Sequence, residues 1–184
     1  MAAAAEKCDP GDSVAVEDSG ALGSEMCQGQ AQQPNLTPLL LLYPPHFYSF
    51  KPAPDVYLKA AAAEKCDPGN CVAVEDSGSG VGSAANAGMG LILGYVGASH
   101  IQANKKESHA KMLMAGEKSE DGRGAVLVVE EFRDVATLIN AFKAARAKGE
   151  VKGGKPGAFV FSEEVIKGLK GRVWLPEGKV LVNN

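Results

Sequence analysis

The sequence predicts an α/β fold built on a doubly wound, Rossmann-like parallel sheet, and three observations lead to this prediction. Short apolar runs of strand length recur, as in Cys71 to Glu75 and Leu91 to Val96. Stretches that suit helices alternate with these runs, as parallel strands joined by crossover helices require. A later stretch carries one apolar stripe at helical spacing, formed by Val135, Leu138, Ile139 and Phe142.

The individual elements have local reasons. Pro52 and Pro54 stiffen the entry to the first helix. The small Gly, Ser and Ala side chains of residues 78–87 allow the second helix to approach the sheet closely. The expected helices cover residues 55–65, 78–87 and 105–115 and the apolar stripe, and the expected strands cover residues 71–75, 91–96 and 125–129.

We expect the chain to have three parts. Residues 1–50 are expected to be a largely disordered N-terminus, and residues 51–148 form an α/β core. Residues 149–184 are a C-terminal extension with short strands, a helix over 162–169 and a hairpin turn at 176–178.

The N-terminal part contains a near-copy of a core segment. Residues 2–20 repeat residues 60–78 almost unchanged, and the two stretches differ only at Asp12 against Asn70 and Ser13 against Cys71. The first copy has no lysine motif before it, and Gln, Gly, Pro and Ser dominate residues 20–38 after it. We expect its strand to compete with residues 72–75 for one place in the sheet.

Two interpretations of this duplication remain open. One is a recent duplication or a faulty gene model that replaced the true start of the domain. The other is a duplicated metal-binding half, in which Glu17 and Asp18 would be extra ligands.

Composition excludes several classes of function. The 184 residues carry a net charge of −3 with acids and bases interspersed, so no basic face for nucleic acid is expected. The isolated apolar run Leu39 to Tyr43 is far too short to span a bilayer, and the N-terminus lacks a secretory signal pattern. The four cysteines indicate neither a disulfide framework nor a zinc site. We therefore expect a cytoplasmic protein with a small-molecule ligand.

Two motifs carry the chemistry. KPAPD begins at Lys51, and VAVEDS closes a strand with the adjacent carboxylates Glu75 and Asp76. Neighbouring βα units would bring this cation and this acidic pair together, and the combination suits a phosphate and the divalent metal that neutralises it.

Together these motifs resemble the third and fourth motifs of haloacid dehalogenase superfamily phosphatases, in the branch of phosphoglycolate phosphatase and β-phosphoglucomutase. The third motif of that family has the pattern KPxPD, which residues 51–55 match. The fourth has the pattern EDSxxGxxxAxxAGM, matched by Glu75, Asp76, Ser77, Gly80, Ala84, Ala87, Gly88 and Met89. The likeness covers the C-terminal half of the family's core domain.

This resemblance implies a Mg²⁺-dependent hydrolase of small phosphorylated metabolites. It assigns Lys51 to catalysis and to the phosphoryl group, and Glu75 and Asp76 to Mg²⁺. Ser77 and His100 are weaker candidates for substrate contacts, since Ser77 also suits a helix cap and His100 a solvent-facing loop.

The chain departs from the family pattern at its start. No DxD, the family's source of the nucleophilic aspartate, occurs before Lys51, and no cap domain is present. We therefore expect a truncated core fragment that is inactive as a phosphatase. The alternative is a non-catalytic remnant or binding module with weak affinity for phosphate or Mg²⁺.

Overall fold

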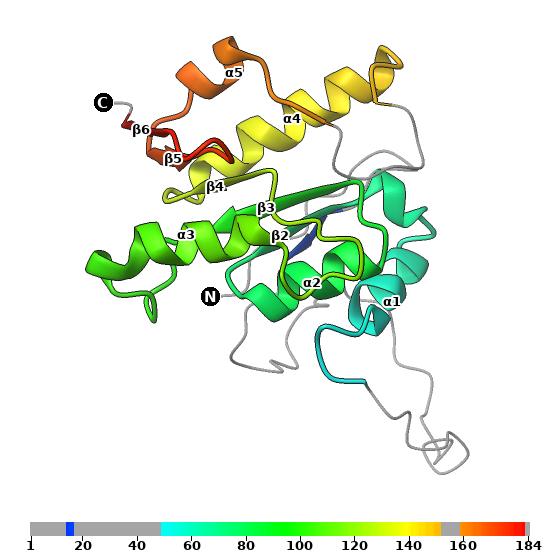
Figure 1. Cartoon of the computed structure of the whole chain (residues 1–184). Coiled ribbons are helices and arrows are strands. Elements are labelled where there is room, and N and C mark those ends of the chain that lie inside the picture. The colour runs from blue at the N-terminus through cyan, green and yellow to red at the C-terminus, as the bar shows by residue number, and fades with distance from the viewer. Residues whose placement is uncertain (1–13, 17–48, 152–158, 183–184) are drawn as a thin grey trace, which may run out of the picture.

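The computed structural model describes residues 14–16, 49–151 and 159–182, and Figure 1 shows their arrangement. They form a six-stranded sheet in the order β1-β2-β3-β4-β5-β6. The strands are β1 (Val14–Val16), β2 (Val72–Glu75), β3 (Leu91–Tyr95), β4 (Leu127–Val129), β5 (Arg172–Trp174) and β6 (Val180–Val182). The α-helices are α1 (Asp55–Ala63), α2 (Gly78–Asn86), α3 (Lys106–Ala115), α4 (Arg133–Ala147) and α5 (Glu163–Lys167).

The α/β prediction is confirmed, and each helix expected between residues 51 and 148 is present. Strands β1 to β4 pair in parallel, as expected for βα units. The stripe predicted for α4 faces the core, with Val135, Leu138 and Phe142 buried and Ile139 partly buried.

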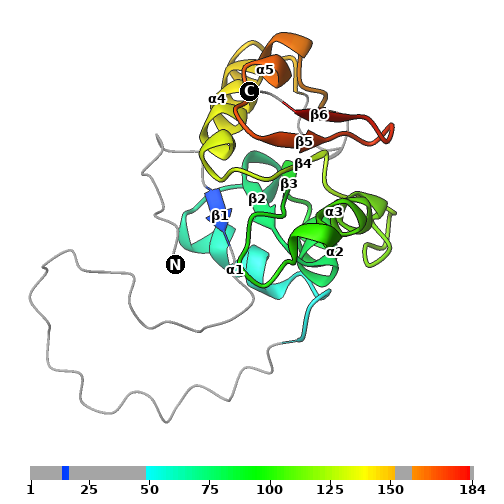
Figure 2. The ribbon, with the colours of Figure 1, turned by 90° about the vertical axis from the view of Figure 1, so that its left-hand side faces the viewer.

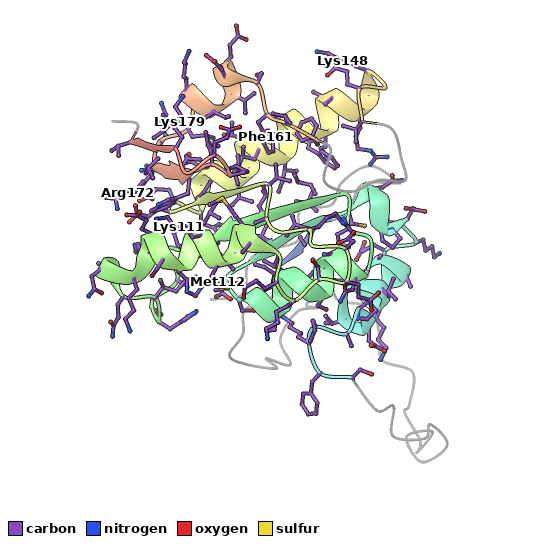
Figure 3. All side chains as sticks on the ribbon, viewed as in Figure 1. Lys111, Met112, Lys148, Phe161, Arg172 and Lys179 are labelled. Atoms are coloured by element: carbon purple, nitrogen blue, oxygen red, sulfur yellow. The ribbon has the colours of Figure 1, made fainter. Side chains whose placement is uncertain are left out.

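Both faces of the sheet are covered by helices, so the doubly wound architecture is also confirmed (Figures 1 and 2). Alternate residues of β2 divide between two apolar clusters. Ala73 belongs to the cluster on the side of α1, α2 and α3, and Val72 and Val74 belong to the cluster that includes residues of α4 and α5. On the first side Met112 of α3, labelled in Figure 3, lies against Gly78 at the start of α2.

The C-terminal extension continues the same sheet in the opposite direction. Strand β5 pairs antiparallel with β4, and β6 pairs antiparallel with β5, so the sheet is mixed. The buried carboxylate of Asp134, in the first turn of α4, accepts hydrogen bonds from the backbone N–H groups of Lys170 and Gly171, both at 2.8 Å. Because α4 begins just after β4 ends, this contact holds the start of β5 near the carboxyl end of β4. Strand β5 therefore runs antiparallel to β4.

The hairpin predicted at residues 176–178 joins β5 and β6. Gly178 adopts the left-handed conformation with φ of 75°, which glycine adopts without a steric penalty. The short helix predicted in the extension is α5, and the hydroxyl of Ser162 caps it by accepting from Val165 N.

The N-terminal repeat contributes β1. This strand lies beside β2 instead of taking its place, and the register sets each residue opposite its counterpart in the other copy, as in Val14 opposite Val72. Residues 1–13 and 17–48 of the predicted disordered segment, among them Glu17 and Asp18, lie outside the described residues. Within the described part of the chain, no helix is both long and apolar enough to cross a membrane.

Candidate functional site

The candidate site lies at the carboxyl end of β2, the edge of a doubly wound sheet where ligands bind. Glu75 is the last residue of β2, and Lys51 lies in the segment that leads into α1. The Lys51 ammonium donates to Glu75 Oε1 at 2.8 Å, although 24 residues separate the two in sequence. The structure therefore brings the KPAPD lysine and the first acid of the VAVEDS motif together.

The Glu75 carboxylate is the centre of a buried network. The residue is 1% exposed. Oε1 accepts from Lys51 Nζ and also from the Tyr57 hydroxyl at 2.5 Å, and Oε2 accepts from the Ser77 hydroxyl at 3.1 Å. Burial raises the pKa of Glu75, while the charge of Lys51 and the hydrogen bonds from Lys51, Tyr57 and Ser77 oppose that rise. The net direction of the pKa is upward because the carboxylate has almost no contact with water.

Ser77 and Gly80 build the turn from β2 into α2. The Ser77 hydroxyl accepts from Gly80 N at 3.1 Å while it donates to Glu75, so it caps the helix and holds the carboxylate at once. A Cβ on residue 80 would overlap the Glu75 carboxylate. Glycine is required there because the helix passes directly against the acid. The predicted contact of Ser77 with substrate stays a prediction.

Asp76 follows Glu75 and is held from two sides. It is 5% exposed, and its Oδ2 lies 3.7 Å from His100 Nε2, so the structure brings both predicted residues into one place. His109 on α3 donates from Nε2 to the backbone oxygen of Asp76 at 2.6 Å. The carbonyl can only accept, so this nitrogen carries the proton. His109 thereby fixes the main chain that presents the carboxylate.

Two residues of the site were not predicted from the sequence. Neither Tyr57 nor His109 is among the site residues that the sequence predicts. A buried tyrosine usually finds a hydrogen-bond partner for its hydroxyl, which was the available signal for Tyr57. For His109 the sequence offers no such signal, because its partner is a backbone atom on a distant element.

Asp76 is the carboxylate of this site that could contact a magnesium ion. Among the described residues, no group of three or more His, Cys, Asp or Glu side chains could hold a metal ion together. Both oxygens of Glu75 already accept hydrogen bonds from protein donors. Asp76 provides the carboxylate beside this network, and Mg²⁺ commonly binds one or two carboxylates while it keeps several waters. Direct binding of the metal by Glu75 stays a prediction.

A second charged cluster lies beyond the ends of the neighbouring strands. Lys106 Nζ donates to Glu130 Oε1 at 2.8 Å, and Arg172, labelled in Figure 3, has its Nε 3.7 Å from Glu130 Oε2. Tyr95 ends β3, and its ring meets Phe132 edge to face at 5.5 Å between centroids. Both cations of this cluster face the carboxylate of Glu130.

Comparison with known proteins gave one solved structure of interest. No protein-family model matches the chain, and no curated protein matches it. The chain is similar to a conserved haloacid dehalogenase-like protein of unknown function from Agrobacterium tumefaciens strain C58, with 34% identity and a TM-score of 0.41. The similarity covers 50% of this chain and 36% of that protein's length.

Proposed function

We propose that this chain binds a phosphate-type anion together with Mg²⁺ at the site of Lys51, Glu75 and Asp76, as the C-terminal half of a haloacid dehalogenase-like hydrolase core would. The natural ligands would be small phosphorylated metabolites. One observation carries the proposal. The Lys51 ammonium is held 2.8 Å from a buried carboxylate at the ligand-binding edge of the sheet, and Asp76 follows that carboxylate directly.

Each side chain has a distinct role in this proposal. Lys51 offers a compact positive charge to a phosphoryl oxygen. Glu75 orients the lysine, and Ser77 keeps Glu75 in place. Asp76 would hold Mg²⁺, directly or through water. A bound magnesium ion would neutralise charge on the phosphate.

We propose binding without turnover. The family's reaction needs an aspartate nucleophile from a DxD motif, and no DxD precedes Lys51 in this sequence. Positioning and charge neutralisation alone leave the phosphorus without an attacking group. This departure favours a binding module over a working phosphatase.

Tungstate, a phosphate mimic, provides the test. We expect it to raise the melting temperature of the full chain, more strongly with Mg²⁺ than without. Lys51→Ala should abolish the shift, and Asp76→Asn should abolish only the magnesium-dependent part. Lys111→Ala is the matched control, because Lys111 is 63% exposed and pairs with Glu107 on the surface of α3.

The same preparation is assayed for phosphate release from an aryl phosphate with Mg²⁺, and none is expected. Tungstate binding that persists in Lys51→Ala would refute the proposed site. Robust turnover by the wild-type chain would refute binding without catalysis, because it requires a nucleophile outside the motifs described.

A further inference from the structure

We propose that Cys66 and Cys71 form a redox-sensitive thiol pair, which closes to an internal disulfide when the folded chain meets a small disulfide such as glutathione disulfide. Both cysteines carry reduced thiols in the structure. Cys71 directly precedes β2, whereas Glu75 is the last residue of that strand, so the pair lies at the other end of β2 from the candidate anion site. The thiol pair is therefore separate from the function proposed above.

One short turn brings the two sulfurs together. Cys66 follows the end of α1, and a single 3-10 turn over Pro68–Asn70 leads to Cys71. The Cys71 thiol donates back to the Asp67 carbonyl at 3.4 Å, so its sulfur lies beside the residue that directly follows Cys66. The two thiols also share a hydrogen bond, and both belong to the buried apolar cluster on the side of α1, α2 and α3.

The surrounding backbone keeps this turn in place. Gly90 N donates to the oxygens of Pro68 and Cys71, at 2.9 and 3.0 Å. A Cβ on residue 90 would overlap the oxygen of Gly69, so the turn packs directly against the residue that precedes β3. The two thiols are thus held near each other before any reaction, which favours a bond between them over a bond to a second chain.

The two sulfurs have different roles because they differ in exposure. Cys66 is 8% exposed and Cys71 is 1% exposed, so the incoming disulfide reaches Cys66 first. Burial and the neighbouring Cys66 raise the pKa of Cys71 to about 12, so Cys71 is protonated at neutral pH and does not attack first. The charge of Arg146 opposes that rise, because its guanidinium donates to Asn70 directly before Cys71 and favours the thiolate there.

The reaction balances as two successive thiol–disulfide exchanges. The Cys66 thiolate attacks one sulfur of glutathione disulfide, the bond between the two glutathione sulfurs breaks, and one glutathione leaves. Cys71 then attacks the Cys66 sulfur, and the second glutathione leaves. Each departing glutathione takes up the proton that one cysteine gives up. The two protein thiols are oxidised and the glutathione disulfide is reduced, and the new bond ties the end of α1 to the start of β2.

The N-terminal repeat provides a matched control within the same chain. Cys8 corresponds to Cys66 and has the same neighbours, but Ser13 stands at the position that corresponds to Cys71. The first copy therefore has no second thiol at this spacing. Cys71→Ser gives the second copy the residue of the first, and it should remove the ability to close the internal disulfide.

The test incubates the folded full chain with glutathione disulfide, unfolds it with N-ethylmaleimide present to block the remaining thiols, and digests it with trypsin. Residues 66–105 form one peptide, because lysines stand at positions 65 and 105 and no lysine or arginine stands between them. We expect mass spectrometry to show that this peptide has lost two hydrogens and taken up no maleimide. In Cys71→Ser, one glutathione should remain on Cys66.

The closed disulfide should also raise the melting temperature by about 5 °C, because a cross-link over a short loop lowers the entropy of the unfolded chain. Dithiothreitol should reverse this shift, and Cys71→Ser should show none. A glutathione that stays on Cys66 in the wild type, or linkage to Cys8 or Cys27 instead of Cys71, overturns the proposal. A peptide 66–105 that stays reduced in the folded chain and is oxidised only in urea overturns it as well.

Discussion

Replacement of Lys51 by methionine tests whether the buried carboxylate depends on the lysine. Methionine keeps most of the length of the side chain and removes its charge. Glu75 would then be left 1% exposed, with Tyr57 and Ser77 as its described donors but without the cation that faces it at 2.8 Å. We expect the free energy of unfolding to fall.

The size of the loss follows from the exposure of the pair. Removing one partner of a fully buried ion pair costs about 3–5 kcal/mol. The Lys51 side chain is 22% exposed, and two neutral donors to Glu75 remain, so we expect a smaller loss of about 2 kcal/mol near pH 8.

The loss should depend on pH in a stated direction. Burial raises the pKa of Glu75 in the folded chain, and loss of Lys51 removes a charge that opposes this rise. A carboxyl group with a raised folded-state pKa contributes stability below its unfolded-state pKa and loses it as the pH rises through the folded-state value. The cost of Lys51→Met should therefore shrink as the pH falls toward 5, by at most about 1.4 kcal/mol per pH unit.

Urea unfolding at pH 5 and pH 8 measures this cost. The probe is the fluorescence of Trp174, which is the one tryptophan of the sequence and is 2% exposed. The comparison uses the wild type, Lys51→Met, Glu75→Gln and the double variant. The double variant should recover much of the loss, because no buried charge is left unpaired. An equal penalty at both pH values, or additive losses in the double variant, would refute the reasoning.

Two further predictions concern the core. Asp134→Ala should lower the free energy of unfolding, measured in urea, by about 2–4 kcal/mol, because the N–H groups of Lys170 and Gly171 lose a charged acceptor. Asp134→Asn should lose about half as much. A loss below about 1 kcal/mol for the alanine variant would contradict the role given to this contact. Burial and the neighbouring Cys66 raise the pKa of Cys71 to about 12, so iodoacetamide at pH 8 should alkylate Cys71 only as fast as the chain unfolds. Peptide mass spectrometry checks this, and labelling of the folded chain at the rate of an exposed thiol would exclude it.

Local patterns predicted the α/β core because each element depends mainly on its own residues. A strand buried on both faces has a continuous apolar run, which predicts β2, and the small residues of α2 predict its close approach to the sheet. The direction of β5 has no such local source. Its sequence would suit either orientation, and the side chain of Asp134, 38 residues before the strand begins, decides where the strand starts.

The difference between a local sequence pattern and a long-range contact also separates the predicted from the missed residues of the site. Lys51 and Asp76 stand out because a charged residue in a motif of fixed spacing is visible in the sequence. Tyr57 occupies a helical position that packing alone would explain, and its partner Glu75 lies 18 residues away on another element. His109 contacts a backbone oxygen, and backbone atoms leave no pattern in a sequence.

The internal repeat shows why the VAVEDS motif alone does not define a candidate anion and metal site. Both copies contain VAVEDS, and both contribute a strand to the sheet, since strand formation depends on residues that the copies share. The two positions that differ make specific contacts in the second copy. Asn70 Oδ1 accepts from Arg146 on α4 at 2.5 Å, and Cys71 Sγ donates locally to the Asp67 backbone oxygen at 3.4 Å. Only the second copy follows a KPxPD lysine and precedes the glycine helix that fits against its acid. The carboxylate pair becomes a candidate anion and metal site through those neighbours, so grafting VAVEDS without them should transfer a strand and not a binding site.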